Sequence, residues 1–214
     1  MTKTWDAVII GGGAAGLFCA GVAGQLGKKV LVLDHAPVLG EKIRISGGGR
    51  CNFTNVHSSP ANFLSLNPHF VKSALAKYPS KEFIKLVSTY GIAYHEKHQG
   101  QLFCDDSAKQ IIEMLMSECA KGKVSIRNPV SVESIAQDAT GWNIHTNAGI
   151  EKTKAVVMAT GGLPVPAIGA TAYSLDIAKQ FGLSVVDPRP ALVPLSFTAD
   201  TFGNLNDLAG LSVP

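Results

Sequence analysis

The sequence has few charged residues, and its basic residues form no cluster. Only 16% of the 214 residues are charged against 46% that are hydrophobic, so the chain can bury a substantial core and has the composition of a globular protein. The net charge of +3 comes from scattered lysines and arginines, which does not favour nucleic acid as the main partner. We expect one large domain, or one domain and part of another.

The sequence also lacks any C-x-x-C pair. A disulfide framework or a zinc site would bring cysteines together at short spacings, so the pattern favours reduced thiols in a cytoplasmic protein. His95 and His98 lie near Cys104 and Asp105, but this stretch has the character of a polar loop, and no metal site is predicted. The four cysteines are Cys19, Cys51, Cys104 and Cys119.

The one long uncharged stretch does not have the pattern of a membrane span. Residues 7–27 carry no charge and at first sight resemble a signal peptide or a spanning helix. The three consecutive glycines at 11–13 would disrupt such a helix, and the acidic Asp6 lies where a signal peptide is basic. We therefore expect neither export nor membrane insertion, and a cytoplasmic location.

The chain begins with a strand and a glycine-rich turn. Ala7–Ile10 is apolar and partly β-branched, as in a parallel strand buried on both faces. The next six residues form a G-x-G-x-x-G motif. Its first glycine permits a tight turn, its second lets the backbone approach a pyrophosphate, and its third lets helix and strand pack closely. The cofactor contacts predicted here are Gly11, Gly12, Gly13, Ala14, Ala15 and Gly16.

A helix, a second strand and an acid follow this turn. The helix is expected to reach about Gly27 and to turn a face of small residues to the sheet: Leu17, Ala20, Gly21 and Gly24. The second strand, Val30–Leu33, ends in Asp34. This carboxylate can accept hydrogen bonds from a ribose 2′-hydroxyl and would repel a 2′-phosphate. The order of these elements predicts a Rossmann-like unit that binds an unphosphorylated adenosine ribose.

The segment from Gly40 to Asn55 favours FAD over NAD. It is a long glycine-rich loop at the point where a simple NAD-binding domain would start its next helix. Glycines let backbone N–H groups lie against a flat or anionic ligand, and positive charge for phosphates or a flavin ring comes from Lys42, Arg44 and Arg50. We interpret the loop as lying along the pyrophosphate, the ribityl chain and the flavin. A solvent loop without a ligand is the alternative.

Three stretches resemble the HI0933-like family of flavoproteins, which is related more distantly to the fumarate reductase and succinate dehydrogenase flavoprotein group. They are GGGAAGL at 11–17, KIRISGGGRCNFTN at 42–55 and VVMATGG at 156–162. The resemblance spans essentially the whole chain, including GQLF at 100–103 and GLPVPAIGA at 162–170. It implies non-covalently bound FAD bordered by Ser46, Gly47, Gly48, Gly49, Arg50, Cys51 and Asn52.

Residues 68–121 predict helices that act as scaffold. Two helices are separated at Pro79, with Ser80 as N-cap of the second and an apolar stripe of Phe83, Leu86, Val87 and Tyr90. A third helix begins near Ser107, whose spacing to Gln110 fits a capping box. Its inward face consists of Ile111, Ile112, Leu115 and Cys119.

Residues 124–159 predict a strand at 124–126 and then an antiparallel meander. The meander strands are expected at 130–135, 142–146 and 155–159, with turns at 138–141 and 147–149. The resemblance implies that Val130 presents backbone to adenine. It also implies that FAD is contacted, from the side opposite the glycine turn, by Ala159, Thr160, Gly161 and Gly162. A tight turn without a ligand is the alternative for these four. Residues 169–178 lack the Gly-Asp dipeptide of related flavoproteins, so no contact is assigned there.

The composition changes after Gly182. Prolines at 188, 190 and 194 resemble the exit from an FAD domain into an inserted one. We expect residues 1–187 to form an α/β, Rossmann-like FAD-binding domain with a parallel central sheet and an antiparallel β-meander. Residues 188–214 are expected to begin a second domain. In the resembled family that domain covers the flavin and the chain then returns to the FAD domain, which implies that residues 1–214 alone bind FAD weakly and turn over little.

The expected function is that of an FAD-dependent oxidoreductase. The flavin carries the redox step by hydride transfer, and the protein supplies position, electrostatics and exclusion of solvent. We expect a small-molecule substrate, with NAD(P)H or dioxygen as second redox partner, and neither nucleic acid nor membrane as partner. A nucleotide-binding protein without turnover and a flavoprotein acting on RNA remain as alternatives.

Cys51 is the one residue for which a catalytic role comes into question. It is either a thiol whose pKa is lowered by Arg50 beside the flavin, or a structural cysteine packed under the ring. Without a partner cysteine nearby in the sequence, dithiol–disulfide chemistry is not expected. No catalytic residue is therefore predicted.

Overall fold

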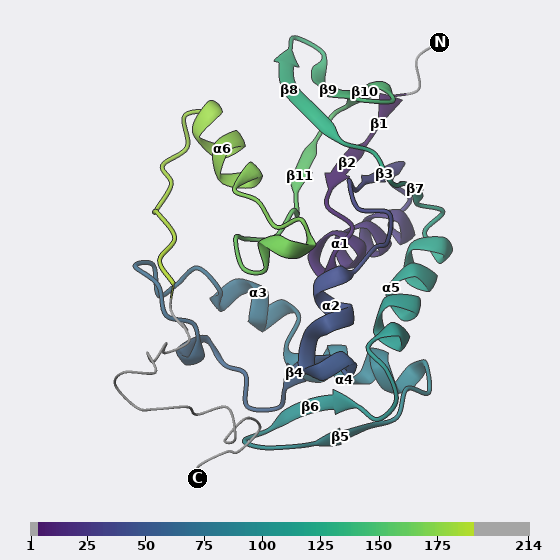
Figure 1. The fold of residues 1–214 in the computed structure, drawn as a ribbon, viewed down its shortest axis with the longest axis vertical. Coiled ribbons are helices and arrows are strands. Elements are labelled where there is room, and N and C mark those ends of the chain that lie inside the picture. Colours follow the sequence, from purple (N-terminus) through teal and green to yellow (C-terminus); the bar gives the residue numbers. More distant parts are fainter. Residues whose placement is uncertain (1–3, 191–214) are drawn as a thin grey trace, which may run out of the picture.

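A computed structural model describes residues 4–190, which form three sheets flanked by helices (Figure 1). A parallel sheet has the strand order β11-β2-β3-β7, a mixed sheet has the order β1-β10-β9-β8, and a small antiparallel sheet has the order β4-β6-β5. The predicted α/β architecture, with a parallel sheet and an antiparallel meander, is confirmed. The predicted second domain starts at the edge of this region, and residues 191–214 lie outside it.

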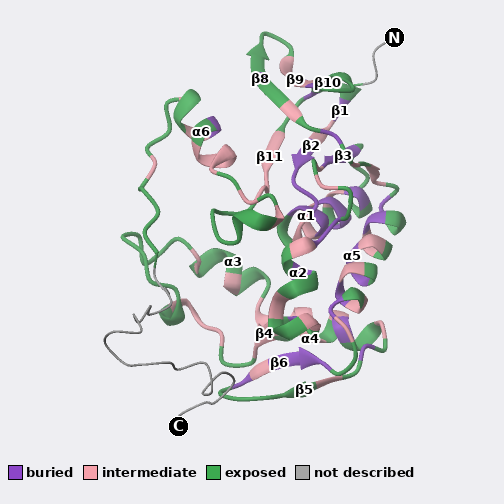
Figure 2. Ribbon diagram, in the orientation of Figure 1, coloured by how far each residue is buried: buried purple, intermediate pink, exposed green. Residues whose placement is uncertain are grey.

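The parallel sheet is built from β2 (Ala7–Ile10), β3 (Val30–Leu33), β7 (Ser125–Arg127) and β11 (Val156–Met158). Alternate side chains of β2 and β3 enter two separate cores. Ile9, Val30 and Val32 pack toward the helices on one face, while Val8 and Leu31 pack toward the mixed sheet on the other. Burial on both faces accounts for the uninterrupted apolar runs. Figure 2 shows the burial gathered on β2 and β3 and on the facing sides of two helices.

Those two helices are α1 (Ala14–Gln25) and α5 (Lys109–Lys121). The small residues of α1 are buried as predicted, but two of them face α5 rather than the sheet. A Cβ atom on Gly21 would lie 3.2 Å from the Glu118 Cβ, and one on Gly24 would lie 2.5 Å from the Gly122 carbonyl oxygen. The glycines therefore let the two helices approach closely.

The mixed sheet contains β1 (Thr4–Trp5), β8 (Val132–Asp138), β9 (Gly141–Thr146) and β10 (Gly149–Thr153). The prediction of a meander returning directly at 155–159 is wrong in one respect. After the turn the chain forms β10, which pairs with β9 and β1, and only then enters the parallel sheet as β11. Most of β10 is exposed and its two charged residues are adjacent, so its sequence gives little sign of a strand.

The segment predicted as one long loop, residues 40–55, is more ordered than expected. It contains α2 (Glu41–Ile45), the 3₁₀ turn η1 (Ser46–Gly49) and β4 (Asn52–Asn55). β4 pairs with β6 (Gln101–Cys104), which pairs with β5 (Tyr94–Glu96). The stretch around the two histidines is therefore a hairpin rather than a polar loop, although its side chains are largely exposed.

The remaining helices follow the predicted order with shifted caps. After η2 (Pro60–Asn62) come α3 (Lys72–Lys77) and α4 (Ser80–Thr89). Pro79, rather than Ser80, is the N-cap of α4, and Ala108, rather than Ser107, is the N-cap of α5. The elements η3 (Pro166–Ile168) and α6 (Tyr173–Gln180) end the described region.

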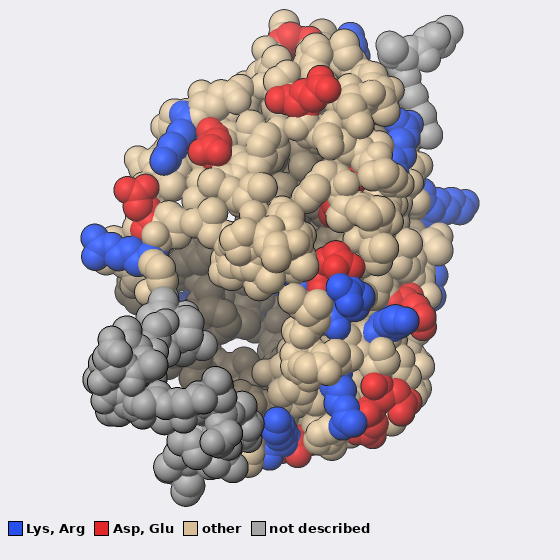
Figure 3. All heavy atoms as spheres, in the orientation of Figure 1, with Lys and Arg blue, Asp and Glu red and all other residues tan. Residues whose placement is uncertain are grey.

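The described surface carries mixed charge. On the face drawn in Figure 3, lysines and arginines alternate with acidic side chains instead of gathering on one side. None of the helices between residues 4 and 190 is long and apolar enough to span a bilayer.

Candidate dinucleotide-binding site

A hollow of about 760 Å³ lies at the carboxyl ends of the parallel strands, where Ile10, Leu33 and Met158 contribute to its wall. This is the edge at which open α/β sheets bind their ligands. Ten of the predicted cofactor contacts line it: Gly11, Gly13, Ala14, Ala15, Asp34, Lys42, Val130, Ala159, Thr160 and Gly161. Segments far apart in the sequence thus form one site.

The three motif glycines have three different surroundings. Gly11 has a φ of +114°, and a Cβ atom there would lie 2.3 Å from the Ala159 carbonyl oxygen. At Gly16 a Cβ atom would lie 1.8 Å from the Gly11 carbonyl oxygen, so the predicted close approach of helix and strand is confirmed. A Cβ atom on Gly13 would meet nothing within 4 Å. The backbone at Gly13 is therefore exposed to the hollow and open to a ligand.

Asp34 is held in place by backbone N–H groups. Its Oδ2 accepts a hydrogen bond from the Gly12 N–H at 2.5 Å, and its Oδ1 accepts one from the Ala36 N–H at 2.7 Å. Each carboxylate oxygen has a further lone pair, which leaves capacity for a ribose hydroxyl. Val130 lies alongside, since its N–H donates to the Asp34 carbonyl oxygen at 2.7 Å.

Gly12 supports the site from behind and does not line the hollow. A Cβ atom on Gly12 would lie 2.4 Å from the Leu39 side chain. Its N–H is engaged by the carboxylate of Asp34, and its predicted contact with a cofactor stays a prediction.

A second hollow of about 580 Å³ adjoins the first and shares four lining residues with it. Those residues are Ala14, Ala15, Lys42 and Ile43. The Lys42 Nζ donates to the Gly162 carbonyl oxygen at 2.8 Å, so this lysine joins α2 to the segment after β11 at the junction. Five aromatic side chains line the second hollow: Phe18, Phe53, Phe63, Tyr78 and Phe83.

The SGGGRCN segment reaches the second hollow with only part of its length. Ser46, Cys51 and Asn52 line it, whereas the residues between them lie outside both hollows. Gly47–Gly49 have φ values of +58°, +67° and +85°, a left-handed run that favours glycine. The run turns away at Ser46 and returns at Cys51, whose N–H donates to the Ser46 carbonyl oxygen at 3.0 Å. The predicted contact residues that line neither hollow are Gly12, Gly16, Gly47, Gly48, Gly49, Arg50 and Gly162.

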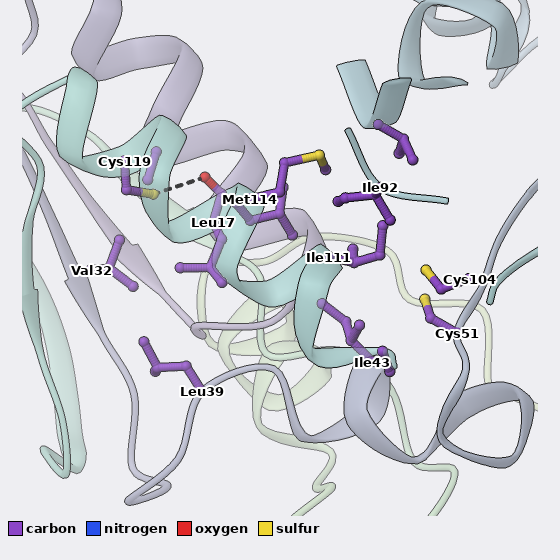
Figure 4. Packing of buried hydrophobic residues seen from close by; sticks show 14 of the residues in the cluster. Leu17, Val32, Leu39, Ile43, Cys51, Ile92, Cys104, Ile111, Met114 and Cys119 are labelled. Carbon is purple, nitrogen blue, oxygen red and sulfur yellow. Dashed lines mark hydrogen bonds between the residues drawn. The ribbon is translucent and has the colours of Figure 1, made fainter. Parts of the chain in front are cut away.

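Cys51 is buried rather than activated. Burial raises the pKa of its thiol, and a hydrogen bond with Ser46 opposes this only partly. A pKa lowered by Arg50 is therefore not what the surroundings of Cys51 produce, and the structural alternative is favoured. Figure 4 places Cys51 in the core that also contains Ile43 and Ile111.

Sequence reasoning missed one wall of the first hollow. This wall runs from η3 to the start of α6 and includes Gly169, Tyr173 and Ser174. The Ser174 hydroxyl is hydrogen-bonded to that of Thr160, and the Tyr173 hydroxyl is buried without a partner. Gly169 has a φ of +86° beside His35, which also lines the hollow. A glycine followed by hydroxyl-bearing residues at a helix start was the available signal.

These surroundings fit FAD. An extended dinucleotide needs an acceptor for a ribose, exposed backbone for a pyrophosphate and a flat space for its ring. Asp34, the open backbone at Gly13 and the aromatic second hollow offer these in that order, and the unpartnered Tyr173 hydroxyl offers one more hydrogen bond. The fold and the site define an FAD-binding Rossmann-type domain of the oxidoreductase class.

The chain belongs to the HI0933-like family. The family model described as HI0933-like protein Rossmann domain matches residues 5–206. The chain is 50% identical over 212 residues to a ribosomal RNA dihydrouridine synthase of Escherichia coli (strain K12). This match covers 99% of this chain and 53% of that protein. It is 49% identical over 218 residues to the protein of the same name from Haemophilus influenzae, covering 100% of this chain and 54% of the relative.

A more distant relative and several solved structures are also similar. A 3-dehydro-bile acid delta(4,6)-reductase of Clostridium scindens is 27% identical over 91% of this chain and 48% of its own length. L-Proline dehydrogenase from P. horikoshii superposes with a TM-score of 0.53 at 14% identity, covering 78% of this chain and 56% of that one. Glycine oxidase from Geobacillus kaustophilus superposes with a TM-score of 0.51 at 17% identity, and the match covers 86% of this chain and 60% of that one. These two structures show the fold alone. The chain spans about half the length of the curated relatives.

Proposed function

We propose that this chain is the FAD-binding part of a flavoenzyme that reduces a uracil base of ribosomal RNA to dihydrouracil. The observation that carries this proposal is the identity of about one half, along the whole chain, to two proteins named as ribosomal RNA dihydrouridine synthases. The reaction adds a hydride and a proton across a ring double bond that is conjugated to a carbonyl group. The name of the bile-acid relative describes a reductase of the same bond type, because its double bonds lie next to an oxo group.

The proposed substrate differs from the small molecule expected from the sequence. Nothing in residues 4–190 decides between a small molecule and a nucleic acid as the substrate. Because acidic and basic side chains alternate on the face drawn in Figure 3, RNA contacts are better sought elsewhere in the molecule. The bile-acid relative supports a second candidate, a small molecule with a conjugated carbon–carbon double bond.

The chain's own residues would bind and orient the cofactor. Asp34 would accept the adenosine ribose hydroxyls, the backbone at Gly13 and the N-terminus of α1 would face the pyrophosphate, and Val130 would border the adenine. Lys42, at the junction of the two hollows, would add positive charge beside the phosphates. FAD held in this way would, once reduced by a reductant of the NAD(P)H class, supply the hydride.

The aromatic second hollow would hold the flat flavin ring. Phe18 lies 5.0 Å from Tyr78 and 6.2 Å from Phe83 between ring centroids, so these rings form a continuous apolar wall. Such a wall excludes water from a ring that exchanges hydride. We further propose that a second domain begins near residue 188 and carries substrate contacts, and that the protein acts in the cytoplasm.

The test uses unmodified ribosomal RNA made by transcription in vitro. The whole flavoenzyme that contains this chain is purified, loaded with FAD and incubated with this RNA and NADPH, and RNA fragments are analysed by mass spectrometry. We expect one uridine-containing fragment to gain two hydrogen atoms. A protein whose flavin is reduced by NADPH but which leaves the RNA unchanged would refute the RNA substrate. Turnover of a conjugated steroid ketone in that case would support the second candidate.

A further inference from the structure

Two cysteines that are distant in the sequence meet between β4 and β6. Cys51 immediately precedes β4 and has a left-handed φ of +53°, and Cys104 is the last residue of β6. Their chain neighbours Asn52 and Phe103 pair in antiparallel register. The two backbones are in direct contact here, because the Cys104 N–H donates to the Arg50 carbonyl oxygen at 2.9 Å. Figure 4 shows the two sulfur atoms next to one another.

This placement suits a covalent link. A disulfide needs two thiols whose side chains point toward one another from neighbouring backbone segments. Figure 4 shows this arrangement for Cys51 and Cys104. The pKa of the Cys104 thiol is raised to about 11, mainly by burial and secondly by the neighbouring Cys51 thiol.

The two cysteines differ in access. Cys51 lines the second hollow, whereas Cys104 lies behind it with an exposed fraction of 0%. A small oxidant in the hollow therefore meets Cys51 before Cys104, and the raised pKa of the Cys51 thiol makes its oxidation slow. Cys119 is engaged elsewhere, since its Sγ donates to the Leu17 carbonyl oxygen on α1 at 3.2 Å.

We propose that Cys51 and Cys104 form a peroxide-sensitive thiol pair that closes to an intramolecular disulfide behind the second hollow. Hydrogen peroxide oxidises the Cys51 thiol to a sulfenic acid, and one water is released. The Cys104 sulfur then attacks the Cys51 sulfur, the S–S bond forms, and the hydroxyl group leaves with the Cys104 proton as a second water. One peroxide and two thiols thus give one disulfide and two waters.

The disulfide would fix β4 to β6 and remove a thiol from the wall of the second hollow. The inference depends on the packing of the two side chains and not on the proposed reaction with RNA. Its test therefore needs neither NADPH nor a substrate.

The experiment treats the native protein with hydrogen peroxide, alkylates the remaining thiols after unfolding, and maps the peptides without reduction. We expect a linked pair of peptides containing Cys51 and Cys104, lighter by two hydrogen atoms and separated again by dithiothreitol. Cys19 and Cys119 are expected to be alkylated. Protein unfolded in urea before the peroxide is added should lose the preference for this pair.

Two variants complete the test. Cys104→Ala should abolish the link and let Cys51 proceed to a sulfinic acid, because no second thiol intercepts the sulfenic acid. Cys119→Ala, also a buried cysteine but on α5, should keep the link. Native wild-type protein that shows no linked peptide, or that links other cysteines equally, overturns the inference whether or not the variants fold.

Discussion

At the scale of single residues, Asp34 serves the fold and the ligand with the same group. Two backbone N–H groups, from Gly12 and Ala36, fix the orientation of its carboxylate before any ligand arrives. A carboxylate that is already oriented loses little conformational entropy on binding. The carboxyl end of a strand, with a glycine turn beside it, is where this can be achieved.

Removal of the Tyr173 hydroxyl is predicted to weaken FAD binding without destabilising the cofactor-free fold. It is buried without a partner, and leaving such a group unsatisfied costs about 1–3 kcal/mol. Tyr173→Phe should therefore leave the free energy of unfolding of the cofactor-free protein unchanged or increase it. The FAD dissociation constant should rise about two- to tenfold, because one hydrogen bond of about 0.5–1.5 kcal/mol is lost.

Chemical denaturation and a titration of flavin fluorescence measure the two quantities for Tyr173→Phe. Tyr94→Phe, a half-buried tyrosine outside both hollows, is the matched control and should leave FAD affinity unchanged. An unchanged affinity in Tyr173→Phe as well would show that the hydroxyl does not meet the cofactor.

The buried thiols predict a loss of stability in alkali. Burial raises the pKa of Cys104 and of Cys119 from 9.0 to about 11. At pH values well below 9.0, both the folded and the unfolded chain keep the two thiol protons, so the free energy of unfolding does not depend on these thiols. As pH rises from about 9 toward 11, the unfolded chain releases them first and the free energy of unfolding decreases. Urea denaturation at a series of pH values should show this decrease, and Cys119→Ala should make it shallower.

At the scale of elements, the hydrophobic pattern of a segment and its burial decide whether the sequence predicts it. β2 and β3 were predictable because both faces are buried and the runs are apolar throughout, and the fold of the first unit follows from them. β10 and β5 are short, exposed strands that exist because a neighbouring strand pairs with them, and no local pattern marks them. Their formation is a tertiary effect.

The same distinction applies to the site. The sequence could point to Gly11, Gly13–Ala15, Asp34 and Lys42, which line the first hollow, because a local spacing marks them, while their contact with a cofactor stays a prediction. The wall from η3 to α6 depends on the chain returning to β2 after more than a hundred residues, and no local pattern contains that information. Gly47–Gly49 were predicted to touch the ligand, which stays a prediction, and their left-handed backbone gives these glycines a second reason, the turn itself.

Close packing of α1 on α5 predicts a sharp response to one methyl group. In Gly24→Ala the new Cβ atom would lie 2.5 Å from the Gly122 carbonyl oxygen, so the helices must separate. We expect the free energy of unfolding to fall by about 1–3 kcal/mol, as for other overpacked sites. Val22→Ala, on the exposed side of the same helix, should change it by less than about 0.5 kcal/mol. Equal stability of Gly24→Ala and the wild type in urea would contradict this packing.

At the scale of the whole molecule, the binding of FAD should stabilise the described fold against heat. A ligand at a hundredfold excess over its dissociation constant adds about 2.7 kcal/mol to the free energy of unfolding. For a protein of this size that corresponds to a rise in Tm of about 5–10 °C. NADP⁺ should produce a smaller rise, because its 2′-phosphate meets the Asp34 carboxylate. Calorimetry with each nucleotide measures the difference, and equal rises would show that Asp34 does not face the ribose.

The first hollow is walled by residues from Ile10 to Ser174, and β11 closes it by pairing with β2. Translation delivers these parts in order, with the glycine turn early and the closing strand late. A nascent chain on the ribosome therefore exposes an unfinished pocket until the segment around Ser174 has emerged. A ribosome that stalls before residue 156 releases a polypeptide that lacks both β11 and the wall from η3 to α6.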